Sequence, residues 1–308
     1  MKDFKFSLII PHINEGYLLN IMLDSMHNFF AYQNYEIIIV DDGSDDLSDL
    51  DFIWNHFLKE KISLYFVNNL WLANVKNFWA SKANGEYLIF LDSHMYFQDD
   101  FLWKLNAILQ KHPEVDLLQP CIGSIKDKKM QGLIYKIKNY NLESTWDVII
   151  DESESLVITP NIAGGASIIK KTVFHICEGF NKFFIKWWCE DLEFSMRSQL
   201  HWFWAYCSSE LFVAHYFKTS FTNTHVTAEQ VVNNKIMFAL SCFSYDNQSQ
   251  ILQEIKKQSW EDFFNKIYAQ VLNNKEFLKW NNIQKQQQKL SDDFYMKKFE
   301  KYYKNIKT

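Results

Sequence analysis

Residues 35–46 read YEIIIVDDGSDD, an apolar run that stops abruptly at two aspartates, a glycine and a serine. The run has the length of a buried β-strand and is rich in β-branched isoleucine and valine. Asp, Gly and Ser favour turns, so the strand is expected to end near Val40. Such a segment alone is more often a turn than a binding site, so its meaning depends on the segments around it.

The first hundred residues alternate between strands and helices. Apolar runs predict strands at 6–10, 35–40, 62–67 and 86–91, with Pro11 breaking the first. Apolar residues at helical spacing predict helices at 17–30, 49–60 and 72–83. Near-continuous apolar strands separated by helices are typical of a parallel sheet covered on both faces. The sequence therefore predicts an α/β fold of the nucleotide-binding type.

Composition narrows the setting. The chain has 308 residues, of which 48% are hydrophobic, enough to bury a large core. A net charge of -5 argues against nucleic acid as the main partner. Five widely spaced cysteines without a CxxC pair fit reduced thiols. The N-terminal segment turns polar too early for a signal peptide, and no apolar run approaches the roughly 20 residues of a spanning helix. A cytoplasmic protein is expected.

Polar residues follow each predicted strand. The strand ends carry PHINE at 11–15, DDGS at 41–44, NN at 68–69 and DSH at 92–94. In open α/β sheets, ligands bind beyond the carboxyl ends of the strands. Any one of these clusters is readily explained as a turn or a helix cap. Four of them at one edge of a sheet predict a binding site.

Three stretches, SLIIPHINEG, EIIIVDDGSDD and NGEYLIFLDSH, resemble in order and spacing the nucleotide-sugar-binding half of GT-A-fold glycosyltransferases, above all the inverting family 2. The resemblance covers about residues 6–218. It implies a mixed, mostly parallel sheet flanked by helices, and a UDP-sugar donor. By match, the uracil and ribose are held by Pro11, Glu15, Asp41 and Asp42. A carboxylate can accept the uracil imide hydrogen and the ribose hydroxyls, and which aspartate makes which contact stays open.

Asp92-Ser93-His94 stands where family members usually carry Asp-x-Asp, and resembles the Asp-Ser-His of polypeptide N-acetylgalactosaminyltransferases. Those enzymes complete a metal site with a later histidine in a V-x-H-x-F-[RK] stretch; FVAHYFK at 212–218 has this form and supplies His215. The resemblance implies a cation held by Asp92, His94 and His215, with Ser93 as a donor contact. Oxygen and imidazole ligands together favour Mn²⁺, with Mg²⁺ as the alternative. Continued strand geometry would bring the first two side chains together, and a core histidine is the alternative for the third.

A third element, NIAGG at 161–165 followed by CEDLEFSMR at 189–197, completes the match. Both related families carry a small-Gly-Gly stretch that lines the donor sugar, here Gly164 and Gly165. The second segment predicts a helix start with acids in its first turn. The resemblance implies that Asp191 removes the acceptor proton, while Glu190 orients the acceptor or the donor sugar. Simple capping is the alternative.

Weaker signals surround these motifs. Lys76 falls where the polypeptide transferases have a diphosphate-side arginine, and Arg197 or Lys218 could also reach the phosphates. Trp187 and Trp188 flank the acids and could stack on a sugar of the acceptor. A solvated surface charge is the alternative for each cation, and core packing is the alternative for each tryptophan.

The predicted function is a metal-dependent glycosyltransferase that uses UDP-GalNAc, UDP-GlcNAc, UDP-Gal or UDP-Glc and a glycan, lipid-linked or peptide acceptor. The Glu-Asp pair resembles the inverting family, whereas polypeptide transferases carry Glu-Asn and retain the anomeric configuration. Inversion with Asp191 as base is therefore favoured. Retention of the polypeptide-transferase type and a non-catalytic GT-A-fold binding module are the alternatives. A nucleotidyltransferase fits poorly, because PHINEGYLL has one glycine where a phosphate loop would be glycine-rich.

The predicted catalytic domain spans 1–220, with a nucleotide-binding half at 1–97 and an acceptor and catalytic half at 98–220. A helical C-terminal region follows at 221–308. It could pack on the catalytic domain, form a homodimer interface or bind an acceptor. Its last stretch, YMKKFEKYYKNIKT at 295–308, is basic and aromatic. That composition would suit peripheral contact with an anionic membrane.

Overall fold

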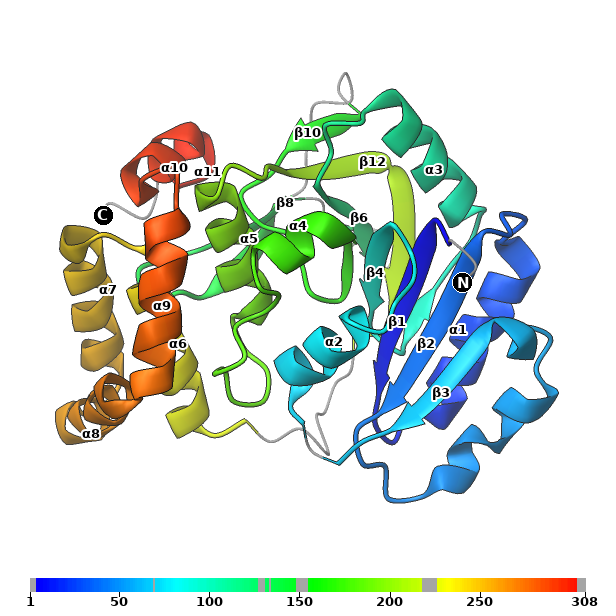
Figure 1. The fold of residues 1–308 in the computed structure, drawn as a ribbon, viewed down its shortest axis with the longest axis horizontal. Coiled ribbons are helices and arrows are strands. Elements are labelled where there is room, and N and C mark those ends of the chain that lie inside the picture. The colour runs from blue at the N-terminus through cyan, green and yellow to red at the C-terminus, as the bar shows by residue number, and fades with distance from the viewer. Residues whose placement is uncertain are drawn as a thin grey trace.

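A computed structural model describes residues 4–68, 70–126, 131–132, 134–147, 155–217 and 226–303. One large mixed sheet runs through the protein, with helices on both of its faces and a group of C-terminal helices at one end (Figure 1). The predicted domain boundary at 220 falls in residues 218–225, outside the described part. None of the described helices is long and apolar enough to cross a membrane. The five cysteines are all described, and each is a free thiol.

The predicted parallel sheet is confirmed for the N-terminal strands. These are β1 (Phe6–His12), β2 (Tyr35–Asp41), β3 (Ile62–Phe66) and β4 (Tyr87–Leu91), which lie side by side in the order β3-β2-β1-β4. The prediction that Pro11 ends the first strand is wrong, because β1 continues to His12. Pairing of β1 with β4 stops at Ile9 and Phe90, so the proline lies where β1 pairs with β2 alone.

Beyond β4 the strand direction changes. The neighbours are, in spatial order, β11 (Ala166–Lys170), β6 (Leu117–Ser124), β12 (Ala205–His215) and β10 (Leu156–Ile158). β11 is antiparallel to β4 and to β6, whereas β6 and β12 are parallel. The short strands β7 (Gln131–Gly132), β8 (Ile134–Ile137) and β9 (Ser144–Asp147) lie nearby in the chain, and β8 pairs with β9.

One short pairing matters for the site. β5 (Met95–Tyr96) begins directly after Asp92-Ser93-His94 and pairs antiparallel with the end of β12. In that pairing His215 lies opposite Met95, and the backbone N–H of Tyr216 donates to the carbonyl of His94 at 3.1 Å. The two segments, far apart in the sequence, are thereby fixed side by side.

Alternation along the strands explains why both faces of the sheet are covered. On one face, side chains such as Leu8 and Ile37 pack with α1 (Gly16–Phe29) and α3 (Phe101–Lys111). On the other face, Ile9 and Ile38 pack with α2 (Leu72–Ala80) and α4 (Lys171–Ile176). The helix predicted at 49–60 is instead a pair of 3₁₀ helices, η1 (Leu47–Asn55) and η2 (Lys59–Lys61). Because successive side chains of a strand point to opposite faces, the helices cover apolar residues on both faces of the sheet. Polar groups can then gather at the strand ends.

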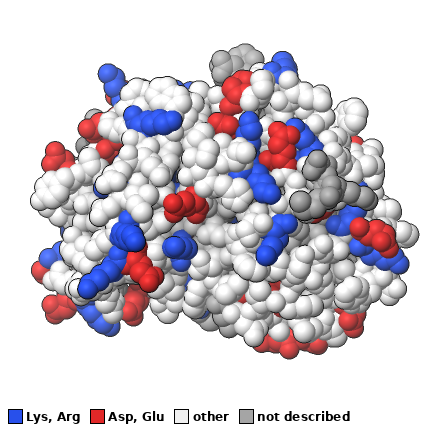
Figure 2. All heavy atoms as spheres, viewed as in Figure 1, with Lys and Arg blue, Asp and Glu red and all other residues white. Residues whose placement is uncertain are grey.

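The C-terminal region is helical, as predicted, and packs on the rest of the protein. Its helices are α6 (Ala228–Cys242), α7 (Tyr245–Gln258), α8 (Glu261–Asn273), α9 (Lys275–Gln287), α10 (Asp292–Lys298) and α11 (Glu300–Tyr303). They share a hydrophobic core with Leu192, Met196 and Leu200 of α5 (Glu190–Leu200). Figure 1 shows them at the opposite end of the molecule from β3. On the face of the protein shown in Figure 2, basic and acidic side chains are interspersed.

An ion pair inside this core fixes α5. Arg197 and Glu193 are both fully buried and joined by two hydrogen bonds, Nε to Oε1 at 2.6 Å and Nη2 to Oε2 at 3.0 Å. The guanidinium also donates to the carbonyls of Cys177 and Gly179 that follow α4. The suggestion that Arg197 reaches the donor phosphates is therefore wrong, and Lys218 lies outside the described residues.

Replacing Arg197 with methionine should destabilise the protein strongly, because the Glu193 carboxylate would stay buried without its partner. We expect the free energy of unfolding to fall by about 3–5 kcal/mol, measured by urea denaturation. Lys257→Met is the control, since it breaks the exposed pair between Lys257 and Glu254 and should change stability little. Equal losses in the two variants would contradict this account of α5.

Candidate donor and metal site

A cavity of about 400 Å³ opens where the ends of β1, β2, β4 and β12 meet. Apart from the weaker candidates Arg197 and Lys218, it is lined by every residue predicted from the sequence to form the site except Asp41 and Trp188. Strand ends, the start of α2, the segment before β11 and the start of α5 all contribute. The structure thus brings together residues spread over more than two hundred positions of the chain.

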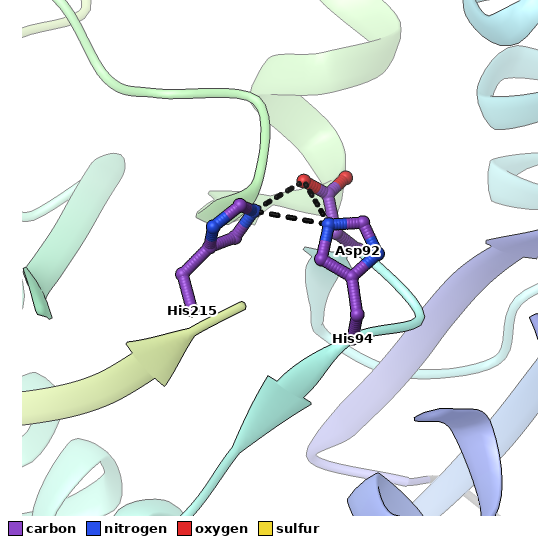
Figure 3. A group of neighbouring side chains, drawn as sticks. All are labelled: Asp92, His94 and His215. Atoms are coloured by element: carbon purple, nitrogen blue, oxygen red, sulfur yellow. Dashed lines mark hydrogen bonds and ion pairs between the residues drawn. The ribbon is translucent and has the colours of Figure 1, made fainter. Parts of the chain in front are cut away.

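Asp92, His94 and His215 form a compact group, here called the metal cluster (Figure 3). The two Nε2 atoms of the histidines are 3.1 Å apart, and Asp92 Oδ2 lies 3.3 Å from His215 Nε2 and 4.0 Å from His94 Nε2. Metal–ligand bonds of about 2.1 Å place neighbouring ligand atoms roughly 3 Å or more apart, so these three atoms could hold one divalent cation. A carboxylate with two imidazoles suits Mn²⁺.

The route by which Asp92 and His94 converge differs from the prediction. The backbone turns at Ser93 and His94 before β5 begins, so strand geometry is not the reason that these side chains meet. The turn aims both side chains toward the end of β12, and the pairing of β5 with β12 supplies His215.

The far nitrogen of His94 has a carboxylate partner. Glu15 Oε2 lies 2.6 Å from His94 Nδ1 and also accepts a hydrogen bond from Ser93 Oγ at 3.0 Å. The backbone N–H of Glu15 points at His12 Nε2, 3.2 Å away, and His12 Nδ1 lies 2.9 Å from Asp41 Oδ2. A carboxylate on the distal nitrogen fixes the ring and leaves Nε2 for a metal. Glu15, which was predicted to contact the nucleotide, lines the cavity, and its carboxylate is placed to orient His94.

The two aspartates after β2 have different environments. Asp41 is buried, does not line the cavity, and accepts hydrogen bonds from His12 and from the backbone N–H of Ser44. Burial would raise the pKa of Asp41, but these hydrogen bonds hold it below its usual range. Asp42 lines the cavity and accepts from the backbone N–H of Leu70 at 2.9 Å. Of the two aspartates predicted to contact the nucleotide, only Asp42 therefore lines the cavity.

Gly164 and Gly165, the glycine pair, lie between the two acidic parts of the site. The backbone N–H of Gly164 donates to Asp191 Oδ2 at 2.9 Å. The carbonyl of Gly165 accepts from the N–H of Asp92 at 3.0 Å, and a Cβ on Gly165 would lie 2.8 Å from Asp92 Oδ2. A side chain at Gly165 would displace Asp92, so glycine is required there for the backbone to approach so closely.

Lys76 is buried, so the alternative that it is a solvated surface charge is wrong. It projects from α2, and its Nζ donates to the carbonyl of Gly164 at 3.2 Å. Burial alone would raise the pKa of Asp92, but the hydrogen bond from His215 and nearby positive charges, including Lys76, hold it well below its usual range. The ammonium thus lies where an anionic group in the cavity would meet it.

The acid pair, Glu190 and Asp191, begins α5 and faces the cavity. Burial, with repulsion from Glu190 adding to it, raises the pKa of Asp191 to about 7. Its two oxygens accept from the backbone N–H groups of Gly164 and Leu192. One carboxyl of the site is thus kept ionised beside the histidines, while another is poised to exchange a proton near neutral pH.

Of the two tryptophans, only Trp187 lines the cavity, where its ring could face a sugar. Trp188 lines a smaller recess of about 110 Å³, shared with the acid pair, and packs against the core of the C-terminal helices. Six further residues that line the cavity were not predicted to form the site: His12, Ile13, Trp71, Leu72, Val75 and Lys186. His12 could have been suspected from its place in the first strand end, between Pro11 and the predicted contact Glu15.

Comparison with known proteins identifies the family. The family model described as glycosyl transferase family 2 matches residues 7–175, more than half of the chain. The chain belongs to glycosyl transferase family 2. This agrees with the resemblance found in the strand-end motifs, which lie within the matched residues.

Two relatives and one solved structure extend the comparison. An uncharacterised glycosyltransferase of Haemophilus influenzae is 40% identical over 34% of this chain and 43% of its own length. Polypeptide N-acetylgalactosaminyltransferase 11 of Xenopus tropicalis is 29% identical over 62% of this chain and 34% of its own length. The crystal structure of GalNAc-T7 with UDP, GalNAc and Mn²⁺ is 16% identical, with a TM-score of 0.78 over 98% of this chain and 58% of that chain. The fold is therefore GT-A, and the chain spans less than half the length of these curated relatives.

The Asp191 carboxyl should titrate near neutral pH. We expect it to be protonated below about pH 7 and ionised above, because burial disfavours its charge. Carbon-13 NMR of aspartate-labelled protein should show one carboxyl titrating in that range, and Asp191→Asn should remove that resonance. Asp41 serves as an internal control, since it should remain ionised down to low pH. Ordinary acidic titration of every aspartate would contradict this description of the site.

Proposed function

We propose that this protein is a glycosyltransferase that moves a sugar from a UDP-sugar to an acceptor hydroxyl. The observation that carries the proposal is the position of the glycine pair. Gly165 contacts Asp92 of the metal cluster, and the neighbouring Gly164 contacts Asp191 of the acid pair. A donor could therefore lie in this one cavity with its diphosphate at the metal cluster and its sugar beside the acid pair. Membership of glycosyl transferase family 2 supports the same reaction class.

The proposed donor is a uridine diphosphate sugar: UDP-GalNAc, UDP-GlcNAc, UDP-Gal or UDP-Glc. Pro11 and Asp42, at the ends of β1 and β2, line the cavity and would contact the uridine. The GalNAc-T7 structure, which has the same fold, contains UDP and GalNAc, which supports a donor of this kind. The glycine pair and Trp187 would face the sugar.

The metal cluster would hold the divalent cation of the reaction, Mn²⁺ with Mg²⁺ as the alternative. A bound cation supplies positive charge to the diphosphate as it leaves. The residues fit such an ion, because their three ligand atoms converge and Glu15 presents the Nε2 of His94. Lys76, buried beside Gly164, would add positive charge on the leaving-group side. The Mn²⁺ in the GalNAc-T7 structure supports the choice of metal.

Asp191 would act as the base of an inverting reaction. Its carboxylate takes the proton of the acceptor hydroxyl while the acceptor oxygen bonds to the anomeric carbon. The bond from that carbon to the diphosphate oxygen breaks, and UDP leaves with the electron pair. Burial, with the charge of Glu190 adding to it, raises the pKa of Asp191 and so makes its carboxylate a stronger base. Glu190 would also orient the acceptor or the donor sugar.

Retention is the alternative, because the chain shares its fold with GalNAc-T7 and sequence similarity with a polypeptide N-acetylgalactosaminyltransferase. The anomer of the sugar first released by slow hydrolysis of an α-linked UDP-sugar separates the two outcomes. NMR should show the β anomer first for inversion and the α anomer first for retention. The same hydrolysis, screened across UDP-sugars, reports the donor without knowledge of the acceptor.

The acceptor and the location of the protein are part of the same proposal. The acceptor would be a glycan, a lipid-linked sugar or a peptide, and the location cytoplasmic. The basic C-terminal stretch, of which 304–308 lies outside the described residues, would make any membrane contact. The C-terminal helices are the surface proposed for a homodimer.

UDP should bind more tightly with Mn²⁺ than without it, measured by isothermal titration calorimetry. His215→Ala should remove this dependence, because one of the three converging ligands is lost. His112→Ala is the matched control: its histidine pairs with Glu114 outside the site and should keep the Mn²⁺ effect. Equal affinity for UDP in wild-type protein with and without Mn²⁺ would overturn the metal assignment.

Asp191→Asn should keep the affinity for UDP and Mn²⁺ but slow sugar transfer or hydrolysis by about 100-fold or more, because the general base is lost. The wild-type rate should fall as the pH drops below about 7, where Asp191 becomes protonated. Asp116→Asn, which alters an aspartate outside the cavity, is the control. A near wild-type rate in Asp191→Asn with normal donor binding would show that another group is the base.

A further inference from the structure

The segment 185–189, here called the tryptophan loop, has an unusual backbone. Lys186, Trp188 and Cys189 all have positive φ, at 57°, 139° and 66°. Residues with a Cβ rarely adopt such angles, because the side chain crowds the backbone, and each costs energy. A loop that concentrates three of them in four positions needs outside contacts to hold it.

The tryptophan loop forms one wall of the donor cavity. The side chains of Lys186 and Trp187 line the cavity, and Cys189 leads directly into α5. The backbone N–H of Trp188 donates to Glu190 Oε2 at 3.0 Å, so the loop also sets the direction of that carboxylate. Movement of the loop would therefore move the acid pair relative to the glycine pair.

A side chain from the C-terminal helices holds the loop by hydrogen bonds. Asn234 in α6 is fully buried, and its Oδ1 accepts from the backbone N–H of Ile185 at 2.9 Å. Its Nδ2 donates to the carbonyls of Ile185 at 3.1 Å and Trp188 at 3.2 Å. Asn233 Nδ2 donates to the same Oδ1 at 3.2 Å. Both donors and both acceptor positions of the amide are thus used.

We propose that Asn234 is a positioning residue for sugar transfer: it clamps the tryptophan loop so that Trp187 faces the cavity and Glu190 stands beside Asp191. This inference rests on the proposed function and gives the C-terminal helices a part in it. The metal cluster comes from the turn between β4 and β5 and from the end of β12, whereas the hydrogen bonds of Asn234 described here go to Ile185, Trp188 and Asn233. Donor phosphate binding should therefore be independent of the clamp.

Asn234→Ala and Asn234→Asp test the clamp in the full chain. The alanine variant loses every hydrogen bond, and the aspartate variant keeps the shape but loses both donors. Asn281→Ala is the matched control, because Asn281 in α9 is also buried and donates to the carbonyl of Leu240, away from the loop. Melting temperatures of the three variants report any general loss of stability.

Two readouts separate positioning from stability. In both Asn234 variants kcat for UDP-sugar hydrolysis should fall by about 10-fold or more, as misplaced catalytic groups do, while the affinity for UDP with Mn²⁺ stays within about 2-fold of wild type. Trypsin should cut after Lys186 faster in folded Asn234 variants than in wild type. Asn281→Ala should match wild type in kcat and in cleavage, even if its melting temperature drops.

Wild-type kcat and unchanged cleavage in both Asn234 variants would overturn the inference. So would a loss of UDP affinity in proportion to the loss of kcat, because the clamp would then act on the whole site. Wild-type protein that hydrolyses no UDP-sugar would instead refute the proposed function. Trypsin sensitivity would in that case still report whether Asn234 holds the loop.

Discussion

The antiparallel pairing of β5 with β12 is the contact on which the rest of the site depends. Two backbone segments more than a hundred residues apart are joined there, and the pairing sets His215 next to His94. Because the register of a strand pair fixes which residues face each other, the metal cluster forms as a consequence of sheet formation. β6 pairs with β12 as far as His215, and β4 leads into the turn before β5, so buried strands hold both segments in place.

The site separates two carboxyl groups by their surroundings. Asp92 lies among histidines and near the Lys76 ammonium, which keep its pKa low and the group ionised. Asp191 lies buried next to Glu190, which raises its pKa toward neutral pH. The same chemical group thus suits cation binding in one place and proton removal in the other. The glycine pair between them allows both to share one cavity.

Much of the fold was readable in the sequence because β1, β2 and β4 are buried on both faces and are therefore apolar along most of their length. The site residues could be located because they follow those strands. Their individual roles could not, because these depend on the direction of each side chain. Asp41 points inward and accepts a hydrogen bond from the N–H of Gly43, which has a φ of 94°, while Asp42 lines the cavity. The roles of Glu15 and Asn234 arise from contacts between distant segments, which no local pattern encodes.

In the proposed reaction, Asp92, His94 and His215 bind the metal that holds the donor diphosphate. Electron–nuclear double resonance of the Mn²⁺–UDP complex, with the protein labelled with nitrogen-15 at histidine, counts the histidine ligands directly. We expect two directly coordinated histidine nitrogens, one of them lost in His215→Ala, together with phosphorus coupling from UDP. A bound Mn²⁺ with phosphorus coupling but no histidine nitrogen in its coordination shell would contradict this assignment.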